Sequence, residues 1–504
     1  MGADQRGRML PMTDVLVVGA GPTGLLAAGD LAAADVSCTV LERRKGESNL
    51  SRAAGVHART LEELDARGLA DELVESGLPV DKLVVFGRAR LDLSGLPTRF
   101  PYMLAVPQYR TEALLESRAR RLGVRIVPGA EVVGLRQDAD GVDLDVRTRE
   151  GETRTYRARY VVAADGVHSR VRELLGLSFP GRSAVRSVML CDVRLADPPP
   201  DLLMADAVED GFAFVLPFGD GWYRVIVWDR RNPLPDTAPV ELGEIRDVTR
   251  RVLGTDFGMH DPRWISRFSS DERQVPHYRA GRVFLAGDAA HVHSPAGGLG
   301  MNTGLQDGAN LGWKLAAVIR NGAPASLLDT YDAERRPAGR KALRISGMLL
   351  QAALARPRTP GAVRRAALRL APRMPPLARR MARSLSGIGL AYPAPRGSHP
   401  LTGRRAPDIP LAGPGRPTLY QALRTRRLVL VTPPDVWLPV SLIAAWRDRV
   451  DVAAAGGRTS RLVLVRPDGY VAWAADCADP GVPTDELRAA LAAWCGPPLA
   501  AVPL

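Results

Sequence analysis

The sequence lacks several features of membrane, secreted and metal-binding proteins. No uninterrupted apolar run approaches the roughly 18 residues that a membrane helix needs. The charged N-terminus has no apolar stretch behind it of the kind that a secretory signal carries. The four cysteines show no CxxC spacing, so neither a disulfide scaffold nor a cysteine-ligated zinc site is expected. These absences favour a cytoplasmic protein without a metal site.

Lysine is also scarce, since only four of the 68 basic residues are lysine. Seventeen basic residues and no acidic residue lie within residues 335–407. The whole chain has a net charge of +13, so the residues outside this segment carry a net charge of −4. No zinc-finger spacing and no aromatic RNA-binding signature accompanies this excess. The favoured interpretation is a solvated helical face, with a membrane-surface contact as the alternative. Nucleic-acid binding is not expected.

Length and periodicity predict a multidomain α/β protein. The 504 residues are enough for two to four domains. Residues 1–13 precede the first periodic segment and are expected to be a leader. Residues 14–42 then predict a buried strand, a glycine turn, a helix rich in small residues and a second strand. A continuous apolar strand pattern, like that of the first strand, recurs at VFLAGDAAH. The first domain is therefore expected to be discontinuous and to comprise residues 14–179 and 276–395, including long helices.

Two other regions differ from this first domain in their pattern of strands and turns. Residues 180–275 contain well-separated strands bounded by proline, glycine and aspartate, which predicts an inserted antiparallel sheet. Part of residues 80–110 is expected to join it. After a linker rich in proline and glycine, residues 400–504 alternate short strands with a closing helix and predict a compact C-terminal α/β unit.

The first chemical motif is Gly19-Ala20-Gly21-Pro22-Thr23-Gly24, between the first strand and the helix. Gly19 permits a tight turn, Gly21 removes the Cβ that would block a pyrophosphate, and Gly24 lets helix and strand pack closely. The helix N-terminus then offers N–H groups and a positive dipole end to phosphate. Glu42 ends the second strand, where a carboxylate can accept hydrogen bonds from ribose hydroxyls. Together these features predict an adenine-dinucleotide site.

Two more sites place an aspartate at the end of an apolar strand, where parallel sheets present ligands. They are Asp165-Gly166 and Gly287-Asp288. Asp288 can accept a hydrogen bond from a polyol chain such as ribityl. The run from Pro295 to Asn302 exposes several N–H groups before a helix, and such a nest suits the electron-rich pyrimidine edge of an isoalloxazine.

With these motifs in order, the sequence resembles the group A flavoprotein monooxygenases, and within them the aromatic polyketide hydroxylases of antibiotic biosynthesis. The resemblance covers nearly the whole chain from Asp14 onward. It implies a Rossmann-like FAD-binding domain, an inserted substrate domain and a C-terminal thioredoxin-like domain, which has no CxxC here and hence no expected redox role. It is carried by GAGPTG, SRAAGVHARTLE around Arg52, PQYRTEALL around Gln108, DGVHSRVR, DFGMHDPRW, GDAAHVHSPAGGLGMNTGLQDGANLGWKLA, YDAERRP and RPDGYVAW.

The resemblance also implies the cofactors FAD, NAD(P)H and O2. Glu42 and Arg43 would hold the adenosine half, and Asp165 would support both FAD and the surface open to nicotinamide. NAD(P)H would bind transiently, because no second GxGxxG is present. The full set of expected cofactor contacts is Gly19, Ala20, Gly21, Pro22, Thr23, Gly24, Glu42, Arg43, Arg52, Gln108, Val132, Asp165, Gly166, Gly287, Asp288, Pro295, Gly298, Leu299, Gly300, Met301 and Asn302.

The implied reaction transfers oxygen from a flavin C4a-hydroperoxide to an activated ring, while the protein shields the peroxide from water. The expected substrate is a polycyclic aromatic polyketide, and the expected assembly is a monomer or homodimer. Arg52, Pro295 and His291 are the expected catalytic residues. The expected substrate contacts are Phe212, Phe214, Trp222, Trp228, Pro295, Ala296 and Gly297, although strand alternation turns roughly half of the aromatic side chains toward the core.

Other functions on the same scaffold remain open at this point. Baeyer–Villiger insertion and epoxidation use the same motifs. A flavin halogenase would be expected to carry a WxWxIP segment, which is not found. A non-catalytic binding protein with the dinucleotide fold is disfavoured, because both the Asp165 and the Asp288 sites are present.

Overall fold

A computed structural model describes residues 12–46, 53–86, 89–199, 202–354, 370, 374–415, 417–477 and 483–499. Nearly all of the predicted leader, together with Arg52, lies outside the described residues. Within those ranges, no helix combines the length and the apolar composition needed to cross a bilayer.

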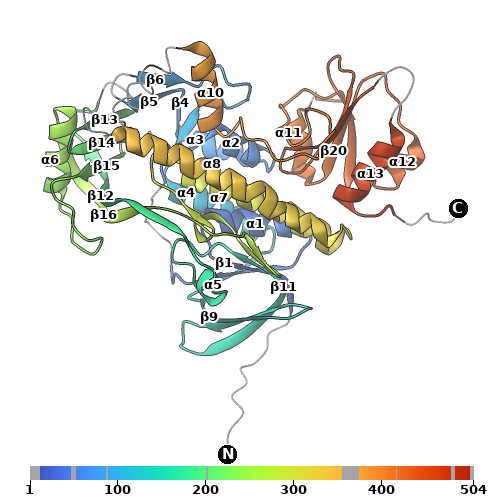
Figure 1. Cartoon of the computed structure of the whole chain (residues 1–504), viewed down its shortest axis with the longest axis horizontal. Helices are drawn as coiled ribbons and strands as arrows, with labels where there is room; N and C mark the ends of the chain where they lie inside the picture. The colour runs from blue at the N-terminus through green and yellow to red at the C-terminus, as the bar shows by residue number, and fades with distance from the viewer. Residues whose placement is uncertain are drawn as a thin grey trace, which may run out of the picture.

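An eight-stranded sheet forms the centre of the first domain (Figure 1). Its path runs β17-β18-β11-β1-β2-β8, with β10 and β9 attached in turn to β11. β18 follows the middle region in the chain but pairs in parallel with β11, so two separate segments build the sheet. The strands are β1 (Thr13–Val18), β2 (Cys38–Glu42), β8 (Arg125–Pro128), β9 (Glu131–Gln137), β10 (Val142–Arg147), β11 (Thr153–Ala163), β17 (Arg279–Ala280) and β18 (Val283–Leu285).

Helix α7 (Leu299–Arg320) packs against α1 (Pro22–Ala32), because glycine recurs every four residues along α7. A Cβ at Gly304 would lie 2.4 Å from Thr23 Oγ1, and one at Gly308 would lie 2.7 Å from the Thr23 carbonyl oxygen. The long helix α8 runs across the molecule in front of α7 (Figure 1). The other helices of this part are α2 (Ala58–Asp65), α3 (Ala70–Glu75), α4 (Gln108–Arg121), α5 (Arg170–Leu174), α8 (Asp329–Ala353) and α10 (Pro375–Leu385).

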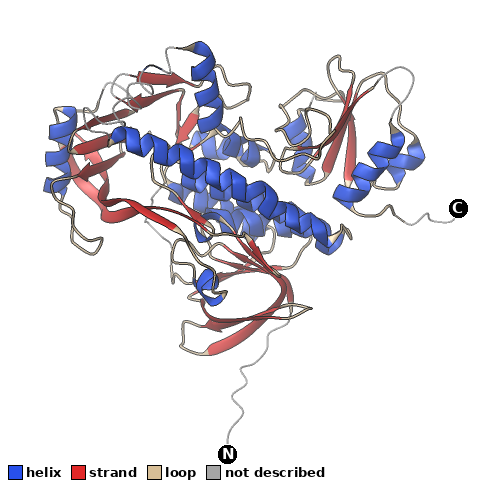
Figure 2. Cartoon of the chain, viewed as in Figure 1, coloured by secondary structure: helices blue, strands red, loops and turns tan. Residues whose placement is uncertain are grey.

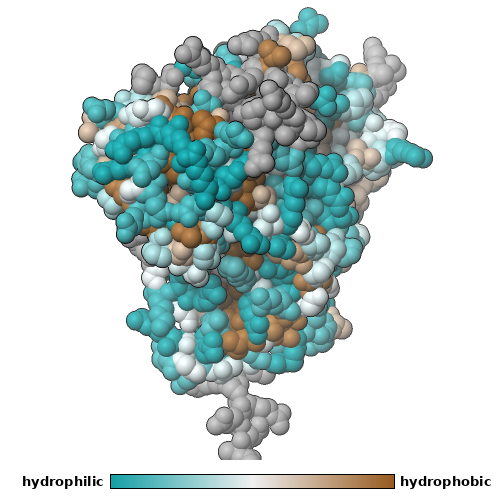
Figure 3. All heavy atoms as spheres, turned by 60° about the vertical axis from the view of Figure 1, so that its left-hand side comes forward, coloured by the Kyte–Doolittle hydropathy of each residue, from teal (hydrophilic) through white to brown (hydrophobic). Residues whose placement is uncertain are grey.

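The middle region is a six-stranded antiparallel sheet of order β13-β14-β15-β12-β16-β19. Helix α6 (Leu242–Leu253) covers one face, where Ile245 and Val248 pack against alternate strand residues such as Val225 and Val227. The face of the molecule that carries this sheet is mostly hydrophilic, with hydrophobic residues in small groups (Figure 3). The strands are β12 (Gly181–Leu195), β13 (Met204–Val208), β14 (Gly211–Pro217), β15 (Tyr223–Asp229), β16 (Met259–Gln274) and β19 (His291–Val292).

Two small sheets, β3-β7-β4 and β5-β6, pack beside the middle sheet and α10. The C-terminal region has its own mixed sheet of order β21-β20-β22-β23, flanked by helices (Figure 2). The small sheets comprise β3 (Gly55–Val56), β4 (Leu78–Val80), β5 (Lys82–Phe86), β6 (Ala89–Asp92) and β7 (Met103–Ala105). The C-terminal elements are α11 (Leu419–Ala422), β20 (Leu428–Thr432), α12 (Val440–Ala444), β21 (Val450–Ala454), β22 (Arg461–Val465), β23 (Val471–Asp476) and α13 (Thr484–Cys495).

Candidate active site

A cavity of about 720 Å³ lies where the carboxyl ends of the first sheet's strands face the middle sheet. It brings together segments that are far apart in the sequence, including the glycine turn, the ends of β2, β11 and β18, and the loop before α7. Of the expected cofactor contacts, the wall contains Gly19, Gly21, Pro22, Thr23, Glu42, Arg43, Gln108, Val132, Asp165, Gly166, Asp288, Pro295, Gly298, Leu299, Gly300 and Met301.

The glycine turn leaves open space where a phosphate would approach. Gly19 has φ +103°, and a Cβ there would lie 2.3 Å from the carbonyl oxygen of Ala164. A Cβ at Gly24 would lie 2.1 Å from the Gly19 carbonyl oxygen, so Gly24 serves packing. A Cβ at Gly21 would meet no atom within 4 Å. The N-cap of α1 is Gly21, whose lack of a side chain leaves the helix N-terminus open, so this turn fits a pyrophosphate.

Glu42 ties the end of β2 to the glycine turn. Its Oε2 accepts the Ala20 N–H at 2.7 Å, and its Oε1 accepts the Arg44 N–H at 2.7 Å. Arg44 also contacts the Glu42 carboxylate through its guanidinium, at 3.1 Å. Arg44, which the sequence motifs did not single out, thus joins Arg43 in the cavity wall. Gln108 connects this region to the next loop, because its Oε1 accepts the Ala53 N–H at 3.1 Å.

The two strand-end aspartates line the cavity in different ways. Asp165 accepts hydrogen bonds from Ser169 Oγ at 2.5 Å and from the Val171 N–H at 3.1 Å, so it organises the start of α5. Burial raises the pKa of Asp165 despite these donors. Asp288 is instead exposed, in the short 3-10 turn after β18. It is therefore positioned to accept a hydrogen bond from a polyol.

The loop before α7 is held in a shape that presents backbone N–H groups. Gly297 and Gly298 have φ +84° and +62°, and Gly298 is the N-cap of α7, where it offers no capping side chain. Asn302 Oδ1 accepts the His57 N–H at 2.8 Å, while its Nδ2 donates to the Gly298 carbonyl at 2.8 Å. His57 Nε2 donates to the Gly297 carbonyl at 2.8 Å. Asn302 itself does not line the cavity; it fixes the loop that does.

The structure places His291, which the sequence predicts to be catalytic, behind the wall of the cavity. His291 is fully buried, is not part of the cavity wall, and stacks on Tyr278 with ring centroids 5.7 Å apart. Its Nε2 lies 2.6 Å from Asp307 Oδ2. The burial follows from pairing, since His291 lies in β19 opposite Gln274. His293, two residues later, lines the cavity instead.

Phe212, Phe214 and Trp228 share one face of the middle sheet, because Phe212 pairs directly with Trp228 across β14 and β15. Phe212 and Phe214 line the cavity, and Ile226 and Phe268 extend this wall. Trp228 does not reach the cavity, because it stacks behind Phe212 at 6.2 Å and donates to the Arg186 carbonyl at 3.0 Å. Trp228, which the sequence predicts to be a substrate contact, thus lies one layer behind the cavity wall.

Trp222 is likewise not a lining residue. It lies in the turn before β15, where the guanidinium of Arg263 stands 3.8 Å from its ring centroid. The substrate contact predicted for Trp222 thus falls outside the wall of this cavity.

Several residues of the cavity wall are not singled out by any sequence motif. Leu349 of α8 and Leu385 of α10 close one side of the cavity, although both lie in the arginine-rich region. Their contribution depends on where two helices pack after the chain has folded. Strand alternation on β15 and β16 could have indicated Ile226 and Phe268, which share a face with Phe212.

The geometry fits FAD, because one cavity joins an uncapped helix start beside Gly21, a carboxylate at Glu42, an exposed carboxylate at Asp288 and the N–H-rich loop before α7. A sequence profile described as FAD binding domain matches residues 12–346. A second, described as Aromatic-ring hydroxylase, C-terminal, matches residues 399–498.

Curated relatives and a solved structure agree with these profiles. The 12-dehydrotetracycline 5-monooxygenase/anhydrotetracycline 6-monooxygenase of Streptomyces rimosus subsp. rimosus is 40% identical over 96% of this chain and 99% of the relative. The rifampicin monooxygenase of Streptomyces venezuelae is 41% identical over 96% and 99%. The structure of OxyS anhydrotetracycline hydroxylase from Streptomyces rimosus has a TM-score of 0.86 and 40% identity, covering 97% of this chain and 100% of that chain. The chain therefore belongs to the FAD-dependent aromatic-ring hydroxylases, and it is an FAD-dependent monooxygenase that uses NAD(P)H and O2.

Proposed function

We propose that the protein hydroxylates a polycyclic aromatic polyketide in antibiotic biosynthesis, with NADPH as the electron donor. The observation that carries this proposal is the continuity of the cavity, which runs from the glycine turn to an aromatic wall at Phe212 and Phe214. Flat, apolar side chains of this kind stack planar rings. The names of the two relatives, which refer to anhydrotetracycline and rifampicin, support a large substrate.

Different residues would bind the different parts of FAD and the substrate. The first N–H groups of α1 would bind the pyrophosphate, Glu42 the adenosine ribose and Asp288 the ribityl hydroxyls. The α7 N-terminus and Gly298 would face the pyrimidine edge of the flavin. When bound, FAD supplies the redox and oxygen-activating chemistry. Pro295 and the aromatic wall would position the ring and exclude water.

The domain division proposed here is an FAD-binding part of residues 14–179 and 276–395, a substrate part of residues 180–275, and a thioredoxin-like part of residues 400–504. The mixed sheet with flanking helices supports the last assignment. A thiol redox role is not proposed for it. Burial raises the pKa of Cys495 to about 12 and also raises the pKa of Cys477, so neither is a reactive thiolate at neutral pH.

The test is the visible spectrum of the purified protein, followed by NADPH oxidation with anhydrotetracycline as the probe. We expect bound flavin, faster NADPH oxidation with the probe, and a product one oxygen heavier. The smaller p-nitrophenol should stimulate oxidation less, because it fills less of the cavity. The structure of the product would separate ring hydroxylation from ring insertion or epoxidation. A protein that cannot be loaded with FAD, or that transfers no oxygen to either probe, would overturn the proposal.

A further inference from the structure

A second, smaller pocket lies beside the loop before α7, between α7, α8 and the end of α10. Its wall includes Gln306 of α7, Lys341 of α8 and Ser384 of α10. Leu299 and Leu385 belong to this wall and to that of the large cavity. The volume is about 50 Å³. A water molecule needs roughly 10–15 Å³ of such space, whereas sites for cofactors and drug-sized ligands measure about 300–1,000 Å³, so a ligand here must be very small.

The charged side chains in the wall of this small pocket are positive. They are Arg335 and Lys341, and no carboxylate joins them among the residues that the structure describes. The Arg335 guanidinium is already engaged, because it donates to Asp307 Oδ1 at 2.7 Å and to the Thr303 carbonyl at 3.1 Å. Lys341, in contrast, has no ion pair within the described ranges. Its unpaired state agrees with the sequence, since no acidic residue occurs within residues 335–407.

The surroundings of Lys341 oppose its positive charge. The side chain is partly exposed, burial lowers its pKa, and the nearby Arg380 lowers that pKa further. Arg380 lies on α10, one turn before Ser384, and it too has no ion pair with the described residues. Neighbouring like charges destabilise one another, and a cleft lined by one sign of charge concentrates ions of the other sign. An anion in the pocket would offset the repulsion between these two side chains.

Gln306 is a buried amide that is turned toward the same pocket. It is 7% exposed, and its side chain makes no hydrogen bond with any described residue. Its Nε2 lies at the pocket wall, because a Cβ on the wall residue Gly387 would be 3.4 Å from it. Neither the amide nitrogen nor the amide oxygen is sealed from solvent, so a small ligand can reach them. Buried polar groups are nearly always paired, so an accessible, unpaired amide at this depth indicates a ligand that completes its bonding.

We propose that this pocket binds a small inorganic anion of the size of chloride, held by the Lys341 ammonium, the Gln306 amide N–H and the Ser384 hydroxyl. All three groups can donate hydrogen bonds. The Ser384 hydroxyl is available for this role, because it has no hydrogen-bond partner in the described part of the chain. The donors come from three helices, so the bound anion would join α7, α8 and α10 beside the loop before α7. The site is separate from the large cavity and takes part in no step of the oxygenation.

The first test is the ³⁵Cl NMR linewidth of chloride in solutions of the FAD-loaded protein. We expect a saturable broadening with the wild type, which nitrate suppresses by competition and the larger gluconate does not. Lys341→Met and Gln306→Leu should each weaken chloride binding by about tenfold or more, because each removes a donor. The matched control is Arg344→Met, which removes an exposed charge of α8 outside the pocket wall and should match the wild type. Wild-type broadening that does not saturate, or equal losses for Lys341→Met and Arg344→Met, would overturn the inference.

Bromide provides the second readout, because it replaces chloride and scatters X-rays anomalously. A crystal of the FAD-loaded wild type soaked in sodium bromide should show an anomalous peak between Lys341 and Gln306. The same soak of Lys341→Met should show no peak there, although FAD remains bound. A water molecule at this position in the wild type, or bromide bound only at other arginines, would contradict the site.

Discussion

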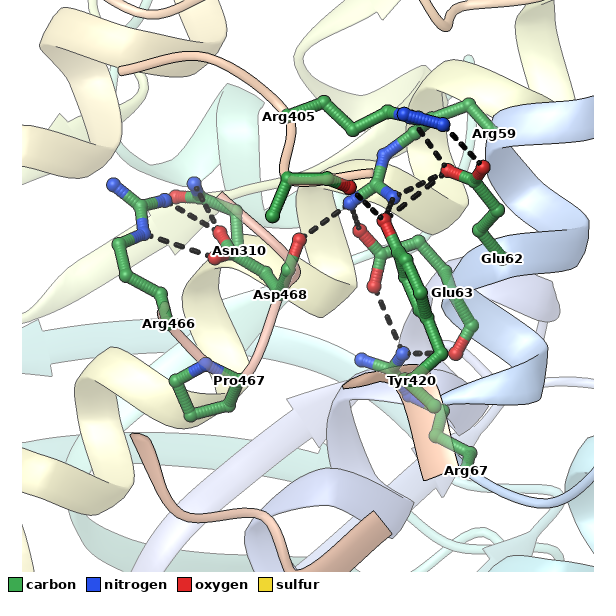
Figure 4. Close-up of polar contacts among 12 residues, drawn as sticks. Arg59, Glu62, Glu63, Arg67, Asn310, Arg405, Tyr420, Arg466, Pro467 and Asp468 are labelled. Carbon is green, nitrogen blue, oxygen red and sulfur yellow. Dashed lines mark hydrogen bonds and ion pairs between the residues drawn. The ribbon is translucent and has the colours of Figure 1, made fainter. Parts of the chain in front are cut away.

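At the interface between the C-terminal sheet and helices α2, α7 and α8, buried charges pair with one another, whereas buried imidazole nitrogens along the cavity lack partners. The interface is drawn in Figure 4. Arg466, in the β22–β23 turn, contacts Glu334 of α8 at 2.7 Å and Asp468 at 2.5 Å. Arg59 of α2 donates to the Tyr420 hydroxyl at 2.7 Å and also to the Asp468 carbonyl.

The cavity wall is different. His57 Nδ1 and His293 Nδ1 are buried and have no hydrogen-bond partner in the described part of the chain. Burial lowers the pKa of His57, and its Nε2 donates to the Gly297 carbonyl, so its Nδ1 carries no hydrogen. The comparison teaches that paired charges hold the C-terminal interface, whereas hydrogen bonds of uncharged groups, such as Asn302 to the Gly298 carbonyl, hold the loop at the cavity wall.

The largest expected effect comes from breaking the interface. Arg466→Met would leave Glu334 and Asp468 buried without their guanidinium. We expect the free energy of unfolding to fall by about 3–5 kcal/mol, as for other buried ion pairs that lose one partner. Equilibrium unfolding in urea measures this change in the free energy of unfolding. The matched control is Arg488→Met, whose exposed pair with Asp485 should contribute at most about 1 kcal/mol. Equal losses for both variants would contradict the structural role of the interface.

Acid should weaken the same interface. Burial opposes ionisation of Glu334, but Arg466 and Lys314 lower its pKa from 4.5 to about 2. A carboxyl with a depressed folded pKa contributes stability above its unfolded pKa and loses it as the pH falls. The free energy of unfolding should therefore drop between pH 4.5 and about 2, by up to about 3 kcal/mol. Glu334→Gln should flatten this dependence. A wild-type profile that is already flat there would argue against the pairing.

A change at the glycine turn should affect the ligand and spare the fold. Gly21→Ala adds a Cβ that meets no protein atom within 4 Å, so the unfolding of the apoprotein should be unchanged. FAD affinity should fall at least tenfold, or about 1.4 kcal/mol, because the methyl group lies where the pyrophosphate approaches. Gly243→Ala, equally open but outside the cavity, should retain FAD. Unaltered FAD affinity in Gly21→Ala would remove this turn from the cofactor site.

The smallest expected effect separates the two groups of aromatic residues. Phe212→Ala should weaken the binding of alizarin, a planar tricyclic phenol, by about tenfold, because a side chain that stacks on its rings is lost. Trp222→Ala should leave the dissociation constant within about twofold, because Trp222 does not line the cavity. The readout is the titration of oxidised holoenzyme by absorbance. A larger loss for Trp222→Ala than for Phe212→Ala would reverse the assignment of the substrate wall.

The sequence predicts well what local geometry determines. The alternation of apolar strands and glycine turns indicates the α/β class. The spacing of the glycine turn predicts three different roles, and the structure places Gly19 and Gly24 in close backbone contacts while Gly21 faces open space. The apolar run at residues 283–285 predicts a second strand segment for the first sheet, and β18 does join that sheet by pairing with β11.

What the sequence does not predict depends on tertiary packing. Alternation puts Phe212 and Trp228 on the same face of the middle sheet, opposite α6, but packing decides which of them lines the cavity, so Phe212 does and Trp228 lies behind it. His291 and His293 are two residues apart and chemically identical, yet pairing of β19 with β16 buries the first. Leu349 and Leu385 reach the cavity only because α8 and α10 pack beside it.

The most direct test of the central claim is the origin of the added oxygen atom. The holoenzyme, NADPH and anhydrotetracycline should be incubated under ¹⁸O₂, and the product analysed by mass spectrometry. The account predicts a product that contains one labelled oxygen atom on a ring carbon. A product whose new oxygen is unlabelled and comes from water, or NADPH oxidation that yields no oxygenated product, would contradict it.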